Sequence, residues 1–318
     1  MQNGSEAILA EMQPILSPYQ FKRLVEALRR SEEEVEPRNN VDLLKLFLTA
    51  KEVEGCSSKT IAYYEATLER LNATLARPYS HITSDDLRGY LNDYEAQRGS
   101  SKVTIDNIRR IMSSFFSWLE DEDYIVKSPV RKIRRVKAPI RTKETLSDED
   151  LQALRDCCDC RRDLAIVDLL SSTGMRVGEL INLDIEDVDI QERECIVTGK
   201  GNRQRPVYFD ARAKLHLLSY LESRSDSSPA LFVSLDGRAK RLSSGAIEKR
   251  LKILGERARV NRVHPHKFRR TLATHAIDKG MPIEQVQRLL GHSKIETTMH
   301  YAMVNQNNVK SSHERYLS

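Results

Sequence analysis

The sequence lacks a long hydrophobic run. Nowhere in its 318 residues does an apolar stretch approach the roughly 18 to 20 residues that a membrane-spanning helix needs. The first thirty residues also lack a basic start followed by an apolar run, which is the pattern of a signal peptide. We therefore expect no membrane association and a cytoplasmic location.

Cysteine is scarce as well. The five cysteines form an odd set, and without a visible secretion signal they indicate reduced thiols. One C-x-x-C spacing occurs in CCDC, 157–160, but a structural zinc site needs four ligands, and neither a second pair nor a nearby histidine is present. A loop of reduced cysteines is the simpler interpretation.

The histidines and acids do not form a metal motif either. Five of the eight histidines lie between His264 and His300, yet none has the H-E-x-x-H spacing of a zinc site. The acidic segment DIEDVDI, 184–190, lacks the glycine and terminal glutamate of an EF-hand loop. We interpret it as a solvated turn and predict no metal site.

Positive charge is concentrated in one segment. The net charge is only +5, and residues 1–40 hold seven acids against five bases. Residues 127–143, by contrast, hold eight lysines and arginines and no acid. A segment of this kind binds a polyanion or stays solvated.

Length and apolar spacing predict two domains. A chain of this length usually forms about two. Residues 1–40 are expected to form a helical extension, and four segments of helical spacing across 41–126 predict a small bundle. The basic segment, which two prolines interrupt, predicts an interdomain linker over 127–144.

The remaining residues, 145–318, predict a second, mostly helical domain. A buried helix ends at Gly174, and later helices begin near Pro265 and Pro282. Between them, β-branched and aromatic runs flank the turn residues 199–202, which predicts a hairpin and a small sheet.

Three short motifs in this domain carry groups that can bind phosphate. His266 and Arg269 lie three residues apart in the first turn of a predicted helix, where an anion is favoured. In TGMRVGEL, a glutamate three residues after the arginine can hold its guanidinium in a fixed pose. Lys200, at the hairpin tip, can reach a DNA groove or donate a proton. Taken singly, each is also compatible with an ordinary surface cap, ion pair or basic turn.

Together these motifs resemble the tyrosine recombinase (phage integrase) family. The resemblance rests on TGMRVGEL, GKGNRQR, HKFRRTLATH and LLGHSKIETTMHY, because the order Arg, Lys, His-x-x-Arg, His, Tyr is specific. Two positions depart from it: Arg270 stands where many relatives have histidine, and Ala302-Met303 follows the tyrosine where a second histidine is common. The catalytic residues that the resemblance implies are Arg176, Lys200, His266, Arg269, His292 and Tyr301, with Glu179 in support.

The resemblance also implies a fold and a reaction. The fold is mainly α, with an N-terminal four-helix core-binding (SAM-like) domain and a mostly helical catalytic domain that has a small antiparallel sheet. Tyr301 would attack DNA to form a 3′-phosphotyrosyl bond, and strand exchange would pass through a Holliday junction. Arg176 and Arg269 would clamp the phosphate, Lys200 would act as general acid, His266 would assist proton transfer, and His292 would hydrogen-bond the phosphate. No metal, ATP or other cofactor is expected.

The implied partner is double-stranded DNA with specific recombination sites. A homotetramer would act on two such sites, with accessory DNA-bending proteins as further candidates and the bacterial nucleoid as its place of action. Affinity would come from phosphate contacts and fall with salt. The candidate DNA-binding residues are Arg131, Lys132, Arg134, Arg135, Lys137 and Arg203.

Several alternatives stay open at this stage. A non-catalytic DNA-binding regulator, a topoisomerase and a histidine-based phosphohydrolase would each use part of the same residue set. Within recombination, integration, excision, inversion and dimer resolution share the machinery. The sequence leaves the target site, cleavage in cis or in trans, the control of direction and the role of residues 1–40 undetermined.

Overall fold

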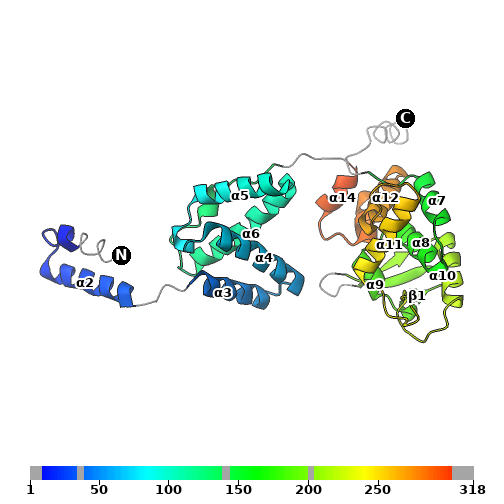
Figure 1. Ribbon diagram of the computed structural model, residues 1–318, viewed down its shortest axis with the longest axis horizontal. Helices are drawn as coiled ribbons and strands as arrows, with labels where there is room; N and C mark the ends of the chain where they lie inside the picture. The colour runs from blue at the N-terminus through cyan, green and yellow to red at the C-terminus, as the bar shows by residue number, and fades with distance from the viewer. Residues whose placement is uncertain (1–8, 34–38, 138–143, 200–203, 303–318) are drawn as a thin grey trace. The chain divides into compact units, whose positions relative to one another are not determined.

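The computed structural model describes residues 9–33, 39–137, 144–199 and 204–302 (Figure 1). The chain divides into two compact units, residues 1–140 and 141–318. Helices predominate, and one small antiparallel sheet is present, so the predicted fold class is confirmed. None of the helices in the described ranges has the length and apolar character that crossing a bilayer requires.

The first unit contains a helix bundle preceded by α2 (Pro18–Glu33). The bundle consists of α3 (Asn40–Val53), α4 (Ser58–Leu75), α5 (Ser84–Arg98) and α6 (Lys102–Asp121). Side chains at Asn39, Ser57, Thr83 and Ser101 accept hydrogen bonds from the first free backbone amides of these helices, which fixes where each helix begins.

Aromatic side chains fill the centre of this bundle. Phe47 of α3 and Phe115 of α6 are fully buried, and their rings meet edge to face with centroids 5.1 Å apart. Tyr79 contacts the Phe115 ring from another direction at 4.8 Å. Such pairs add to the free energy of apolar burial. Phe115 therefore belongs to the hydrophobic core of the bundle.

The first part of the predicted linker over 127–144 contacts the bundle, and the boundary between the two units lies within the same range. This first part folds onto the bundle as the 3₁₀ turn η2 (Pro129–Lys132), with Val130 buried and the Pro129 carbonyl accepting a hydrogen bond from Ser84 at 2.7 Å. Val136 donates its backbone N–H to Asp106 at 3.0 Å. The apolar residues of the segment anchor it through their burial, and the charged residues between them stay exposed and keep their solvation.

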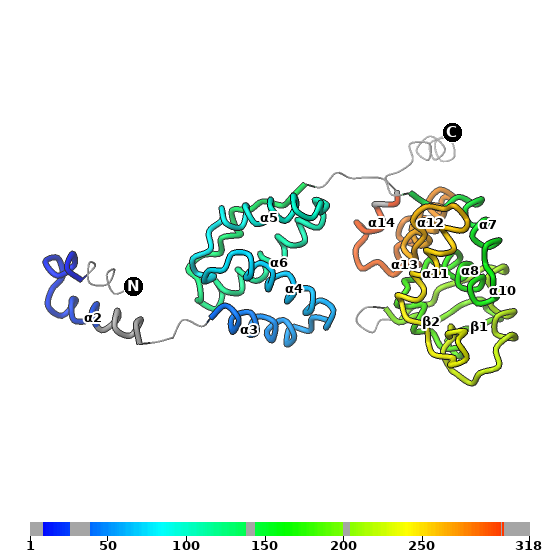
Figure 2. The backbone as a smooth tube through the Cα atoms, in the orientation of Figure 1, coloured from blue at the N-terminus to red at the C-terminus, as the bar shows by residue number. Residues whose placement is uncertain are grey.

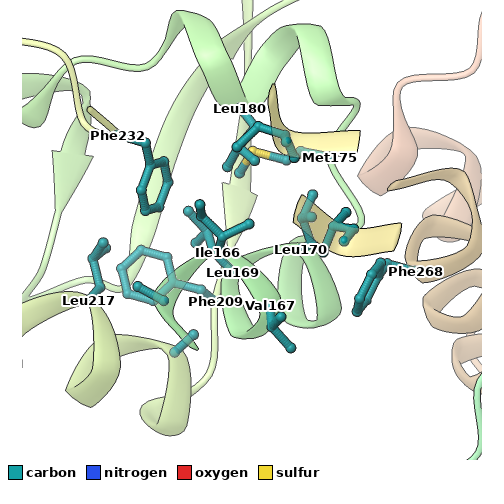
Figure 3. Close-up of a cluster of buried hydrophobic side chains, with 14 of the residues drawn as sticks. Ile166, Val167, Leu169, Leu170, Met175, Leu180, Phe209, Leu217, Phe232 and Phe268 are labelled. Carbon is teal, nitrogen blue, oxygen red and sulfur yellow. The ribbon is translucent and has the colours of Figure 1, made fainter. Parts of the chain in front are cut away.

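The second unit is built around the buried helix α8 (Arg161–Thr173). It packs against α10 (Ala211–Glu222) and α12 (Pro265–Asp278), and α7 (Asp148–Asp156) and α11 (Ser244–Arg257) complete its surroundings (Figure 2). Figure 3 shows Leu170, Phe209 and Phe268 converging on the core from different elements. This core fixes the ends of the helices that carry the candidate site.

A three-stranded antiparallel sheet, in the order β1-β2-β3, completes this unit. Its strands are β1 (Val188–Asp189), β2 (Glu194–Thr198) and β3 (Gln204–Tyr208). In the β2–β3 register, Thr198 pairs with Gln204, as the predicted hairpin requires. The acidic segment that we interpreted as a turn supplies β1, because Val188 pairs with the buried Cys195.

Candidate active site

Arg176 occupies the N-cap of α9 (Val177–Asn182), just after the chain leaves α8 through Gly174. Its guanidinium Nη1 donates to Glu179 Oε1 at 2.7 Å, and its backbone N–H donates to Oε2 of the same carboxylate at 2.8 Å. The predicted pair is therefore present in the structure. The Arg176 side chain is 38% exposed, whereas that of Glu179 is only 3% exposed.

A second arginine shares this carboxylate. Arg205 of β3 donates to both oxygens of Glu179, at 2.7 and 3.0 Å. Burial by itself raises the pKa of Glu179, but hydrogen bonds from Arg205 and from the Arg176 backbone outweigh it and lower the pKa overall. Glu179 is therefore ionised at neutral pH and offsets part of the positive charge of the site.

Arg269 contributes the third guanidinium, from the first turns of α12. It is 3% exposed, and its Nη1 donates to the Gly174 carbonyl at 2.8 Å. Burial, followed by the charge of Arg176, lowers the pKa of Arg269 to about 10. Arg269 therefore stays charged at neutral pH, and its main-chain partners offset part of the cost of burying that charge.

The last turn of α13 (Ile283–Leu290) gathers all three arginines. Three successive carbonyls accept one hydrogen bond each: Leu289 from Arg205 at 3.3 Å, Leu290 from Arg269, and Gly291 from Arg176 at 3.0 Å. A helix C-terminus leaves such carbonyls without intrahelical partners and carries partial negative charge. This end of α13 therefore sets the spacing of the arginines.

His292 and Tyr301 follow directly on this cluster. Gly291 ends α13 with a φ of +64°, and the chain then enters α14 (Ile295–Ala302). His292 Nδ1 lies 2.8 Å from the buried Thr298 Oγ1, and the His292 and Tyr301 rings stack with centroids 6.1 Å apart. The predicted histidine and tyrosine are thus brought together beside the arginines.

The His292 ring is neutral in this setting. Burial, then the positive charges of Arg269, Arg176 and Arg205, lower the pKa of His292 to about 4. A neutral imidazole has one N–H donor and one acceptor nitrogen. With Nδ1 engaged by Thr298, Nε2 is the nitrogen that can interact with a ligand.

Two more positions lie near the start of α12. His266 is exposed, with its ring centroid 6.4 Å from that of the half-buried His264. Arg270, the departure from the family pattern, donates its Nε to the Glu144 carbonyl at 2.8 Å. Arg270 therefore holds the backbone at the start of the second unit. A histidine has no forked guanidinium and could not hold it in this way.

Other predicted residues lie outside this cluster. Lys200 and Arg203 fall outside the described residues. In the first unit, apolar side chains of the basic segment face the core while the intervening bases are exposed, including Arg131, which forms an ion pair with Glu120 at 2.9 Å. The exposed bases are Arg131, Lys132, Arg134, Arg135 and Lys137.

Sequence reasoning missed the roles of Arg205 and Thr298. A signal for Arg205 was available, because residues alternate between the two faces of a strand. Arg205 shares its face of β3 with the buried Val207 and, just beyond the strand, the buried Phe209. An arginine in an inward register needs a buried partner, and Glu179 is that partner.

Comparison with known proteins agrees with the family resemblance of the sequence motifs. The phage integrase family model matches residues 144–308, and the model of the phage integrase N-terminal SAM-like domain matches residues 43–125. Tyrosine recombinase XerA of Pyrococcus furiosus is 32% identical over 280 residues, covering 86% of this chain and 93% of the relative. Tyrosine recombinase XerC of Alcanivorax borkumensis is 32% identical over 278 residues, covering 83% and 89%.

Solved structures share the fold. A crystal structure of XerA recombinase is 29% identical, with a TM-score of 0.51 and coverage of 87% of this chain and 98% of that one. A lambda integrase dimer bound to a COC′ core site is 20% identical, with a TM-score of 0.70 and coverage of 93% and 85%. The chain therefore belongs to the phage integrase family of site-specific tyrosine recombinases, enzymes that cut and rejoin DNA.

Proposed function

We propose that Tyr301 is the nucleophile of a site-specific recombination reaction on double-stranded DNA. Its phenolic oxygen attacks the scissile phosphorus, the bond to the 5′-oxygen breaks, and a 3′-phosphotyrosyl ester and a free 5′-hydroxyl result. The observation that carries this proposal is the stacking of Tyr301 on His292, directly after the α13 carbonyls that hold three arginines. Such a cluster suits a phosphodiester.

The two arginines of the predicted clamp would act on the non-bridging oxygens. Their negative charge grows in the transition state, and preorganised donors stabilise it most in a site with little water. Arg176 is partly exposed, so its guanidinium can donate hydrogen bonds to a phosphate oxygen that approaches from the solvent side. Arg269 is buried and supplies positive charge to the site. The Gly174 carbonyl holds its guanidinium in place.

Proton transfers fall to the remaining residues. A phenol with an unperturbed pKa of about 10 needs help to act as a nucleophile at neutral pH. His266 assists proton removal from Tyr301, and His292, held neutral, donates from Nε2 to a phosphate oxygen. Lys200 protonates the leaving 5′-oxygen.

The energy of the cleaved bond is kept in the phosphotyrosyl ester. Rejoining therefore reverses the first step with a different 5′-hydroxyl and needs no ATP. Guanidinium groups supply the charge that a metal ion supplies in other phosphoryl-transfer sites, so we propose a metal-independent reaction. A homotetramer on two DNA sites would exchange strands through a Holliday junction. Accessory DNA-bending proteins are further candidate partners, and the bacterial nucleoid is the proposed location.

DNA contacts outside the active site fit the charge distribution. The exposed lysines and arginines of residues 131–137 give the first unit a basic segment that can neutralise DNA phosphates. Arg203 and Lys200 of the hairpin are proposed as further contacts. Each such contact raises affinity and its salt dependence without reading sequence.

Covalent trapping tests the proposal. The protein is incubated without metal or ATP with labelled DNA from the flanks of its own gene, including duplexes nicked beside candidate cleavage sites, in parallel with Tyr301→Phe. An SDS-resistant, protease-sensitive adduct that is absent from the variant is expected. Specific binding without any adduct from the unaltered protein would contradict the proposal and favour a regulator. Relaxation of supercoiled DNA without pairing of sites would instead indicate a topoisomerase.

A further inference from the structure

Arg205 has no task in the reaction described above, yet it is more firmly held than Arg176. Its side chain is 14% exposed, against 38% for Arg176. It donates to both Glu179 oxygens at 2.7 and 3.0 Å and to the Leu289 carbonyl at 3.3 Å. Its guanidinium therefore links three elements: β3, α9 and the end of α13.

The first of these links determines how Glu179 can hold Arg176. A carboxylate that is 3% exposed has few water molecules to orient it, so its rotamer depends on its protein partners. Arg205 engages both oxygens, while Arg176 engages one with its side chain and the other with its backbone. Without Arg205, Glu179 would lose its bidentate partner, and Arg176 would lose a fixed acceptor.

The second link determines where the His292 turn lies. A Cβ atom added at Gly291 would come within 2.8 Å of Arg205 Nε and 2.9 Å of its Cδ. The Arg205 side chain thus lies directly against the residue that ends α13 and precedes His292. Its bond to the Leu289 carbonyl holds the same turn two residues before Gly291.

We propose that Arg205 is a positioning residue for DNA strand cleavage, which holds Glu179 for Arg176 and holds the α13 end for His292. This inference rests on the proposed function of the same site. Arg205 does not itself touch the phosphate, because its side chain is only 14% exposed and each of its three guanidinium nitrogens already donates to Glu179 or Leu289. Arg176 differs in being 38% exposed and in using two of its nitrogens on Glu179 and Gly291. A displacement of about 1 Å at a reacting group can lower a rate on the order of 100-fold.

The test compares single-turnover cleavage by Arg205→Met and Arg205→Lys with the unaltered protein, on the nicked duplex that covalent trapping identifies. The matched control is Arg224→Lys. Arg224 is 7% exposed and binds Asp226 at 3.0 Å and the Ala230 carbonyl at 2.7 Å, but it lies apart from the residues of the site. Thermal unfolding of each protein fixes a temperature at which all of them are folded.

We expect Arg205→Met to lower the cleavage rate constant about 10- to 100-fold, with the full fraction of protein still reacting. A merely destabilised protein would instead lose reacting fraction and keep its rate. Arg205→Lys should recover part of the rate, because an ammonium can satisfy one Glu179 oxygen. Arg224→Lys should cleave at the unaltered rate. If Arg205→Met does not fold, the rate of Arg205→Lys carries the comparison.

Two further measurements separate positioning from direct contact. Adding Arg205→Met to Glu179→Gln should cause a smaller loss of rate than Arg205→Met causes alone, because only the link to the end of α13 is then left to remove. The salt dependence of DNA binding should not change, whereas loss of a direct phosphate contact would reduce its slope by about one. An unchanged cleavage rate or a reduced slope would overturn the inference. If the unaltered protein itself forms no adduct, the proposed function fails, and this inference fails with it.

Discussion

The His292 imidazole stacks on the Tyr301 ring, with an angle of 25° between the planes and 6.1 Å between the centroids. His292 lies in the short connection after α13, and Tyr301 lies near the end of the helix that follows, α14. Thr298 of α14 contacts His292 Nδ1, and the small cluster of Leu290, Val286 and Ala273 packs against Tyr301. Local packing thus holds the proposed nucleophile and the histidine proposed to bind the phosphate in contact with each other.

The low pKa of His292 predicts a pH dependence of stability. The unfolded chain takes up a proton on this residue near its ordinary pKa of about 6.5, whereas the folded protein does so only near 4. Protons therefore favour the unfolded state, and stability falls as the pH decreases from about 6.5 towards 4. Urea unfolding at pH 7 and pH 4.5 should show a larger loss for the unaltered protein than for His292→Gln. Equal losses would contradict a buried neutral imidazole.

Arg176→Lys separates charge from geometry. The lysine keeps the positive charge, so DNA affinity and its salt dependence should stay close to those of the unaltered protein. It lacks the planar fork, and removing one preorganised donor of this kind costs about 100- to 1000-fold in rate. Single-turnover cleavage should fall by that factor. A variant that cleaves normally would show that Arg176 contributes charge alone.

Gly291→Ala should combine two penalties. A left-handed conformation costs a non-glycine residue roughly 1–2 kcal/mol, and at Gly291 the added Cβ also meets Arg205 at 2.8 Å. Gly237 has a φ of +79° with nothing within 4 Å, so Gly237→Ala carries the conformational cost without the contact. Chemical denaturation should therefore show a larger loss for Gly291→Ala, accompanied by slower cleavage. Equal losses and normal cleavage would show that the Arg205 side chain yields without consequence.

Thr271→Val tests how the start of the second unit is attached to α12. The Thr271 hydroxyl accepts from the Leu146 N–H at 2.8 Å and donates to the Lys267 carbonyl at 2.9 Å, and the residue is 3% exposed. The variant leaves a buried N–H without its partner, which costs about 1–3 kcal/mol. Thr198→Val, on an exposed strand position, should change stability by less than about 0.5 kcal/mol. A loss at Thr271 no larger than at Thr198 would contradict the assignment.

In much of the chain, short sequence signals indicate where helices begin and end. Cap residues such as Thr83 and Ser147, with an acid three residues later, mark helix starts because they satisfy the first free amides, and both capping boxes are present. Glycines at 174 and 291 mark helix ends because they adopt a left-handed conformation at little cost. The mainly helical class and the hairpin followed from such signals and from apolar spacing.

The basic segment shows what local signals leave undecided. Prolines and a run of bases indicated a linker, but the apolar residues Val130, Ile133 and Val136 were spaced so that they could reach the bundle core. Whether they do so depends on the shape of a surface made by α5 and α6, which no local pattern describes. Burial of these side chains, and the bond from Val136 to Asp106, attach the segment to the first unit.

By itself, the sequence determined the helical class, several helix ends and the order of the site motifs, because caps, glycine ends and apolar periods act over three to seven residues. Only the tertiary structure decided that Arg176, Arg205 and Arg269 meet at three successive carbonyls at the end of α13, those of residues 289–291. It also decided that one buried carboxylate, Glu179, serves two of them. These contacts join residues up to 115 positions apart, so they depend on how the core packs α8, α12 and β3 together.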